Sequence, residues 1–198
     1  MSQVETRGQR RDCAPLTDTD IGQVLRRARI YLDAASPRYA HELLAPFFAE
    51  GAGSVGGRDM EALTLWLDTC QALGLAEECD RRLPELETAC RRGPKGSADR
   101  FVRAVASGAR LLSARGRYPE VLEWCRRAPG SVLELASHQA AVGLLARKQE
   151  ALARLGDFEG AEAVAVEVMD RAEMAGDSAL LGNACGLGLD PAHAGAYP

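Results

Sequence analysis

Six cysteines and three histidines are the residues of this sequence that could act as nucleophiles, bases or metal ligands. The cysteines are Cys13, Cys70, Cys79, Cys90, Cys125 and Cys185, and no two of them lie closer than nine residues. A structural zinc site needs closely spaced Cys or His pairs, which are absent from the sequence. We therefore predict no metal site and expect free, reduced thiols that behave as small buried hydrophobic groups.

The histidines offer no partner for nucleophilic catalysis. A thiol or hydroxyl nucleophile needs a histidine within reach and a third group that orients it. His41, His138 and His193 are isolated, and none lies in a recognisable motif. We expect His41 to be an exposed helix residue, and we predict no catalytic residues and no enzyme.

Two glycine-rich segments raise the question of a phosphate-binding loop. Neither residues 51–57 nor residues 186–188 are followed by the Lys-Ser/Thr pair that such a loop needs. The acidic pairs Glu77/Glu78 and Glu159/Glu162 lie near predicted helix N-termini, where carboxylates favour the helix dipole. We therefore predict no cofactor.

The composition favours a helical globular protein. Hydrophobic residues make up 46% and charged residues 26% of the 198 residues, which is too apolar for a disordered chain. Aromatic residues are only 5%, whereas the helix formers Ala, Leu, Arg and Glu are abundant. The net charge of −4 gives no attraction to nucleic acid, and no apolar run approaches the ~20 residues that span a membrane. Charges also occupy the N-terminus where a signal peptide would be apolar, so we expect a cytoplasmic protein.

A turn between two helical segments recurs four times at a nearly constant interval. The turn positions are Ala35, Gly74, Gly116 and Gly156, which are 39, 42 and 40 residues apart. Glycine tolerates the left-handed conformation that ends many helices. Such a period indicates a repeat array, in which each unit is one helical hairpin. We expect the aromatic residues Tyr118 and Phe158 to fold over their turns.

Three further positions agree across the four units. Five residues after the turn, a slim side chain lets the paired helices approach: Ala40, Cys79, Val121 and Ala161. Four residues before the turn lie Tyr31, Cys70, Leu112 and Leu152. Eleven residues before it lie Val24, Leu63, Val105 and Leu145. This spacing is typical of amphipathic helices that face a common core.

The pattern resembles the tetratricopeptide repeat over about residues 20–176. The last unit carries the family's turn as Gly156, Asp157, Phe158 and, after two residues, Ala161. The period is about 40 rather than the usual ~34 residues, and most units lack the conventional proline after the second helix. The longer period is similar to degenerate repeats of large bacterial transcriptional regulators and signalling ATPases. The resemblance implies an all-α fold, a right-handed α-solenoid of about four helix-turn-helix repeats with a concave and a convex face.

We divide the chain into three parts. Residues 1–19 are expected to form a flexible N-terminal arm, residues 20–176 the helical repeat domain, and residues 177–198 an irregular tail rich in Gly and Pro. Pro84 lies inside a predicted helix and should kink or break it. Residues 131–155 are long enough for two helices or one extended helix, and Ser97 is a candidate helix N-cap.

In tetratricopeptide-like arrays the first helix of each unit lines the concave groove. By this resemblance the groove residues are Arg29, Asp33, Glu61, Thr64, Asp68, Gln71, Arg103, Arg110, Ser113, Glu150 and Arg154. Their mixture of signs suits charge-assisted hydrogen bonds to an extended peptide. The alternative is that these residues are the solvated faces of amphipathic helices.

Three functions follow from these features. The leading hypothesis is a non-catalytic scaffold or adaptor that binds a protein or peptide partner in the groove, or a second copy of the chain in a homodimer. The second is a regulatory sensor that binds a peptide or small molecule and acts on a separate transcription or signalling partner. The third is an enzyme, or an accessory subunit of one, built on a helical scaffold, because a fold does not determine a function.

Overall fold

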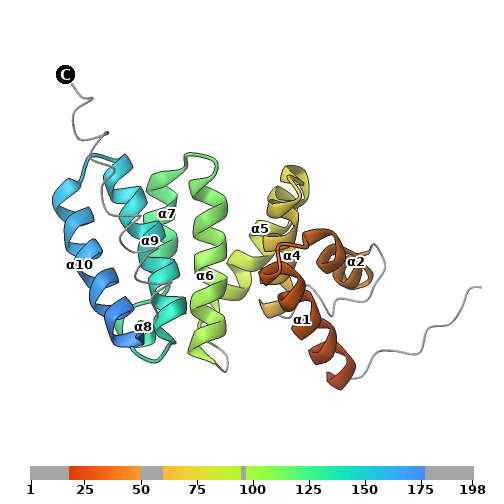
Figure 1. Cartoon of the computed structure of the whole chain (residues 1–198). Helices are drawn as coiled ribbons and strands as arrows, with labels where there is room; N and C mark the ends of the chain where they lie inside the picture. Colours follow the sequence, from red (N-terminus) through yellow and green to blue (C-terminus); the bar gives the residue numbers. More distant parts are fainter. Residues whose placement is uncertain (1–17, 50–59, 95–96, 177–198) are drawn as a thin grey trace, which may run out of the picture.

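The computed structural model describes residues 18–49, 60–94 and 97–176, which contain nine helices and no strand (Figure 1). Helices account for 81% of this part of the chain, so the predicted all-α class is confirmed. The predicted tail and nearly all of the predicted arm lie outside the described residues. The first helix begins at Asp18, two residues before the expected start of the repeat domain.

The helices are α1 (Asp18–Asp33), α2 (Pro37–Phe48), α4 (Met60–Ala72), α5 (Ala76–Arg91), α6 (Ala98–Ser113), α7 (Tyr118–Cys125), α8 (Gly130–Leu133), α9 (His138–Arg154) and α10 (Phe158–Ala175). Eight of them form four hairpins, α1/α2, α4/α5, α6/α7 and α9/α10, and the short α8 connects the last two hairpins. Residues 131–155 thus divide into two helices. The side chain of Ser137 caps the second of these by accepting a hydrogen bond from the N–H of Ala140 at 3.3 Å.

All four turn positions adopt the left-handed backbone conformation. The φ angles are 51° at Ala35, 73° at Gly74, 68° at Gly116 and 84° at Gly156. In each turn the N–H of this residue donates to the carbonyl three residues earlier, and the next N–H donates to the carbonyl five residues earlier. The eight N···O distances lie between 2.8 and 3.1 Å. These paired bonds satisfy carbonyl groups that a helix end otherwise leaves without donors.

The same turn geometry brings the slim side chains into the helix–helix contacts. Five residues after each turn, all four side chains are buried: Ala40, Cys79, Val121 and Ala161. The positions eleven residues before the turn belong to the same hydrophobic core, with Val24 at its edge and Leu63, Val105 and Leu145 inside it. One continuous core therefore runs through all four hairpins.

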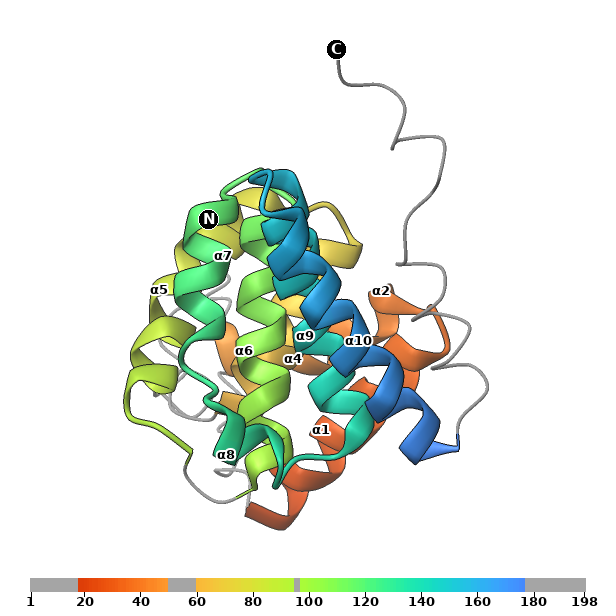
Figure 2. The same ribbon diagram turned by 90° about the vertical axis from the view of Figure 1, so that its left-hand side faces the viewer.

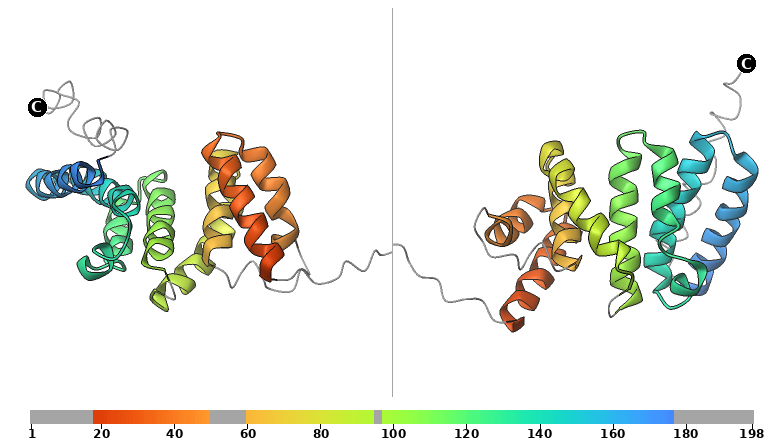
Figure 3. Two further views of the ribbon diagram at one scale, coloured as in Figure 1. Left: turned by 60° about the horizontal axis from the view of Figure 1, so that its bottom comes forward. Right: turned by 180° about the vertical axis from the view of Figure 1, so that it is seen from behind.

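The hairpins lie in a row in chain order, with α10 at one end and α1 and α2 at the other (Figures 1 and 3). The first helices contact one another along the row, α1 with α4, α4 with α6, and α6 with α9. The second helix of each hairpin also packs against the first helix of the next, as α2 does on α4, α5 on α6, and α7 on α9. Each hairpin thus buries its apolar surface against its sequence neighbours.

An aromatic stack joins the first hairpin to the second. Trp66 of α4 stacks on His41 and Phe48 of α2, with ring centroids 4.7 and 4.6 Å apart. Its indole N–H donates to the carboxylate of Glu78 at 2.9 Å, and Arg82 donates to the carbonyl of Phe48 at 3.0 Å. The expectation that His41 is an exposed helix residue is therefore wrong, because the second hairpin half-buries its ring.

The contact between the second and third hairpins contains ion pairs in place of the aromatic stack. Arg115 pairs with Asp80 at 2.6 Å, and Arg127 pairs with Glu87 at 2.8 Å. The guanidinium of Arg127 also lies 4.1 Å from the ring centroid of the buried Trp124. Hydrogen bonds from Arg127 and Arg91 lower the pKa of the Glu87 carboxyl group despite its partial burial.

Two local predictions differ from the structure, and the N-cap position predicted for Ser97 is confirmed. Helix α5 runs from Ala76 to Arg91 across Pro84 without a break, although the proline has no N–H to donate to the carbonyl four residues earlier. Phe158 does not cover its turn but is 63% exposed, whereas Tyr118 packs partly against the core. Ser97 lies at the N-cap of α6, but its side chain makes no capping hydrogen bond.

The turn conformation predicts opposite effects of two substitutions. Ala35→Gly should raise the free energy of unfolding by about 0.5–1 kcal/mol, because alanine resists the left-handed conformation more than glycine does. Gly74→Ala should lower the free energy of unfolding by about 1 kcal/mol. The cause is backbone strain and not a steric clash, since a Cβ at Gly74 would meet no atom within 4 Å. Chemical denaturation measures both changes. Equal signs for the two variants would contradict this account of the turns.

Two helical glycines provide a matched pair for testing packing. A Cβ on Gly108 of α6 would lie 2.3 Å from the ring of Trp124, so Gly108→Ala should destabilise the protein by about 1–3 kcal/mol. A Cβ on Gly143 of α9 would meet nothing within 4 Å, so Gly143→Ala should stabilise it by up to about 1 kcal/mol. Thermal and urea unfolding of both variants distinguish close packing from a general effect of helix propensity.

Candidate functional site

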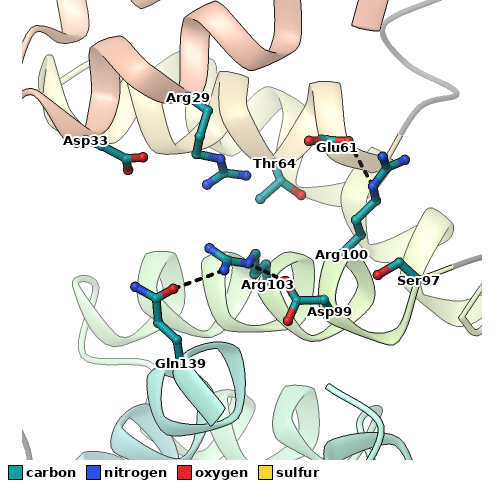
Figure 4. A pocket seen from close by; sticks show the side chains of 9 residues that line it. All are labelled: Arg29, Asp33, Glu61, Thr64, Ser97, Asp99, Arg100, Arg103 and Gln139. Atoms are coloured by element: carbon teal, nitrogen blue, oxygen red, sulfur yellow. Dashed lines mark hydrogen bonds and ion pairs between the residues drawn. The ribbon is translucent and has the colours of Figure 1, made fainter. Parts of the chain in front are cut away.

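A pocket with a volume of about 450 Å³ lies between the first helices of the hairpins (Figure 4). It is lined by Arg29, Asp33, Glu61, Thr64, Ser97, Asp99, Arg100, Arg103 and Gln139. Five of these are residues that the sequence predicts for the groove: Arg29, Asp33, Glu61, Thr64 and Arg103. They come from α1, α4 and α6, and α9 contributes Gln139. Residues more than one hundred positions apart in the chain therefore share one polar pocket.

Helical spacing places these side chains on one face of each helix. Arg29 and Asp33 are four residues apart in the second half of α1, and Asp99 and Arg103 are four apart at the start of α6. Residues at this spacing are neighbours on a helix surface. Because α1, α4 and α6 lie side by side, their polar faces meet at the pocket.

Ion pairs hold two of the three arginines in the pocket. Arg100 of α6 pairs with Glu61 of α4 at 3.1 Å and so connects two hairpins. Arg103 pairs with Asp99 at 2.8 Å and donates to the side-chain oxygen of Gln139 in α9 at 3.3 Å. In Figure 4 the Arg100–Glu61 pair joins the two walls of the pocket, and the contacts of Arg103 hold the lower wall.

Asp99 also connects α6 to the start of α9. Its carboxylate accepts a hydrogen bond from the backbone N–H of Ser137 at 2.9 Å. Partial burial opposes ionisation of Asp99, but hydrogen bonds from Ser137 and Arg103 outweigh this effect and lower the pKa of the carboxyl group. Asp99 is therefore a stable anion at neutral pH and a fixed part of the wall.

Arg29 and Asp33 are the groups in the pocket that remain available to a ligand. Figure 4 shows the side chain of Arg29 extending from α1 into the pocket, on the wall opposite Arg103. Within the described part of the chain, neither Arg29 nor Asp33 makes an ion pair or a hydrogen bond through its side chain. Arg29 therefore offers guanidinium donors, and Asp33 carboxylate acceptors, to a molecule in the pocket.

Two other predicted groove residues form a polar contact next to the pocket. Asp68 of α4 accepts hydrogen bonds from Arg110 and Ser107 of α6, each at 2.5 Å. Thr64, by contrast, is only 2% exposed and donates its hydroxyl to the carbonyl of Met60 at 2.6 Å. Asp68 and Arg110 therefore satisfy each other, and Thr64 contributes shape more than hydrogen bonding.

The remaining predicted residues do not line the pocket. Gln71 is half-buried, and its side-chain oxygen has no hydrogen-bond donor among the described residues. Ser113 is buried at the end of α6. Glu150 pairs with Arg147 within α9 at 2.8 Å, and Arg154 is exposed on the last turn of that helix. Of the residues predicted for a groove, some thus line the pocket and the others are separate polar groups.

Four lining residues were missed by the sequence prediction: Ser97, Asp99, Arg100 and Gln139. The repeat register does not identify Arg100, because Arg100 stands sixteen residues before its turn, whereas its partner Glu61 stands thirteen residues before its own. Gln139 carries no signal in the sequence either, because it enters the pocket only through the packing of α9 on α6.

The described cysteines are free and buried. Burial raises the pKa of Cys70 and Cys90 to about 12 and that of Cys125 to about 11. No group of three or more His, Cys, Asp or Glu suitable for a metal ion occurs among the described residues. Cys13, Cys185 and His193 lie outside them.

Comparison of the chain with protein-family models, curated proteins and solved structures gives no match. None of the helices that the structure describes is long and apolar enough to cross a membrane.

The buried thiols should resist alkylation. At pH 8 the folded protein should leave Cys70, Cys90 and Cys125 unlabelled by iodoacetamide, because the reactive thiolate is disfavoured by burial. Mass spectrometry of peptides should find all three labelled once guanidinium unfolds the chain. Rapid labelling of folded Cys90 would contradict this assignment.

The raised thiol pKa values also predict a pH dependence of stability. Since the ordinary thiol pKa is 9.0, the thiols of the unfolded chain ionise first as the pH rises. The contribution of the buried thiols to the free energy of unfolding should therefore decline above pH 9.

Proposed function

We propose that the chain is a tetratricopeptide-like, right-handed α-solenoid that acts as a non-catalytic scaffold or adaptor. In this proposal the concave face, formed by the first helix of each hairpin, binds an extended segment of a partner protein. The four turns support the repeat, because they share one backbone conformation and one pair of hydrogen bonds at intervals of 39, 42 and 40 residues.

The observation that carries the proposal is the constant span of the contacts between hairpins. Side-chain hydrogen bonds between hairpins join residues 34 to 42 positions apart, from Phe48–Arg82 at the short limit to Asp68–Arg110 at the long one. Each span is close to one repeat. A globular bundle that folds back on itself would also place distant hairpins together, whereas an array has contacts only between neighbours.

The pocket suits a polar extended ligand. Its walls are held by Glu61–Arg100 and Asp99–Arg103, so binding need not order them, which lowers the entropic cost of association. Arg29 would donate to a carboxylate or backbone carbonyl of the ligand, and Asp33 would accept from a backbone N–H or a cationic side chain. A peptide supplies all of these groups along its length.

A charged small molecule is the second candidate ligand, as the regulatory-sensor function requires. The volume of about 450 Å³ falls within the range of small-molecule sites, about 300–1,000 Å³. Such sites are usually lined mainly by hydrophobic side chains, however, and this pocket is lined by three arginines, three acids and three neutral polar residues. The lining therefore favours a peptide or a multiply charged metabolite over an apolar compound.

Selection of peptides on the purified protein tests the function. A display library of random twelve-residue peptides should yield binders, and Arg29→Ala should weaken their affinity by tenfold or more through loss of a charge-assisted hydrogen bond. Arg126→Ala is the matched control, because Arg126 directly follows α7, outside the pocket, and pairs with Glu123. It should change affinity less than twofold.

A thermal-shift screen separates the two ligand classes. A ligand present at about 100 times its dissociation constant should stabilise the protein by about 2.7 kcal/mol. Stabilisation by charged metabolites, with no enriched peptide, would favour the sensor over the scaffold. Peptides that bind wild-type protein and the Arg29→Ala variant equally would place their site outside the pocket and refute the groove assignment.

A further inference from the structure

The first helix, α1, exposes a row of residues whose equivalents in α4 and α6 are buried. In α1 this row, the head surface, consists of Gln23, Arg27 and Ile30, all of them exposed. They stand twelve, eight and five residues before the turn at Ala35. The same three positions are buried in α4 as Ala62, Trp66 and Thr69, and in α6 as Ala104, Gly108 and Leu111. In α4 the rings of His41 and Phe48, from the preceding hairpin, cover Trp66, whereas in α6 Gly108 lies under Trp124 of its own hairpin. No hairpin precedes α1 among the described residues.

The opposite row lies on α10, which packs on α9 (Figure 2). This tail surface consists of Phe158, Glu162, Ala165 and Met169, which stand two, six, nine and thirteen residues after the turn at Gly156. Phe158 is 63% exposed, Glu162 is exposed, and the other two are half-buried. Their spacing places them in one stripe along the helix.

The equivalents of the tail surface contact the next hairpin in the earlier units. In α2 they include His41 and Phe48, which stack on Trp66 of α4. In α5 they include Asp80 and Glu87, which pair with arginines of the third hairpin. The tail surface therefore has the register of a hairpin interface, but no described hairpin follows it.

We propose that the tail surface of one copy of the chain binds the head surface of another, so that the row of hairpins continues from copy to copy. The inference rests on the repeat register proposed above and not on ligand binding in the groove. Within the chain, Trp66 stands eight residues before its turn and contacts the positions six and thirteen residues after the preceding one. In the same register Arg27 of one copy meets Glu162 and Met169 of the other, and Ile30 approaches Phe158.

Charge complementarity identifies the occupant of the tail surface. On α10 the exposed charged residues are all acidic: Glu159, Glu162, Asp170 and Glu173. On the outer face of α1, Arg26 and Arg27 are exposed and have no ion pair among the described residues. Two α10 faces would bring these carboxylates together, which disfavours a symmetric dimer through this helix. Residues 177–198 contain Asp177 and Asp190 and no Lys or Arg, so the chain's own tail complements the surface poorly.

Charge exchange between the two surfaces tests the proposal on the full chain. Sedimentation velocity over about 1–200 µM at low salt should show mass rising from 21.2 kDa with concentration. Association should continue beyond a dimer, because a head-to-tail contact leaves a free surface at each end. Arg27→Glu and Glu162→Arg should each weaken association at least tenfold. An equimolar mixture of the two variants should restore it, since each variant then supplies the charge that the other needs.

A control variant and three further outcomes distinguish this head-to-tail contact from other modes of association. Arg126→Glu, directly after α7 and outside both surfaces, is the control and should associate like the wild type. A monomer at every concentration, or association that Arg27→Glu leaves unchanged, would overturn the proposal. Association that appears only after removal of residues 177–198 would show that the tail covers α10, and would overturn it too. Because Arg29→Ala does not alter either surface, peptide binding can succeed or fail independently of this result.

Discussion

The left-handed turn that closes each hairpin is the constraint on which the rest of the structure depends. It sets the offset between two paired helices, and because all four turns use the same hydrogen bonds, all four hairpins have the same offset. A given position relative to the turn therefore always faces the same way. Slim residues occupy the position where the helices touch, and apolar residues occupy the positions that face the neighbouring hairpins.

Equivalent interfaces in this scaffold use different chemistry. Aromatic stacking on Trp66 joins the first two hairpins, whereas ion pairs of Asp80 and Glu87 join the second and third. The geometry of the turn is common to all of them, but the contact surfaces have diverged. This divergence explains how the four units can share a register while their sequences have so little identity outside the turn and core positions.

Helices, turns and core positions could be predicted from the sequence because the signals for them are local. Glycine at three of four turns and apolar residues at fixed offsets need no knowledge of the neighbouring hairpin. The pocket was only half predicted, because its shape depends on how α9 rotates against α6, which brings in Gln139. Phe158 was misplaced for a related reason. Its exposure depends on what packs beside α10, and no described hairpin follows that helix.

The short span of the contacts also bears on how the chain reaches this structure. Hydrogen bonds between hairpins close loops of 34 to 42 residues, and adjacent hairpins account for the helix packing. Closing such loops costs little additional entropy as the chain lengthens, because no contact has to wait for a distant segment. Folding can therefore start at any adjacent pair of hairpins and spread in both directions. During synthesis on the ribosome, each hairpin can acquire its buried surface as soon as the next one emerges.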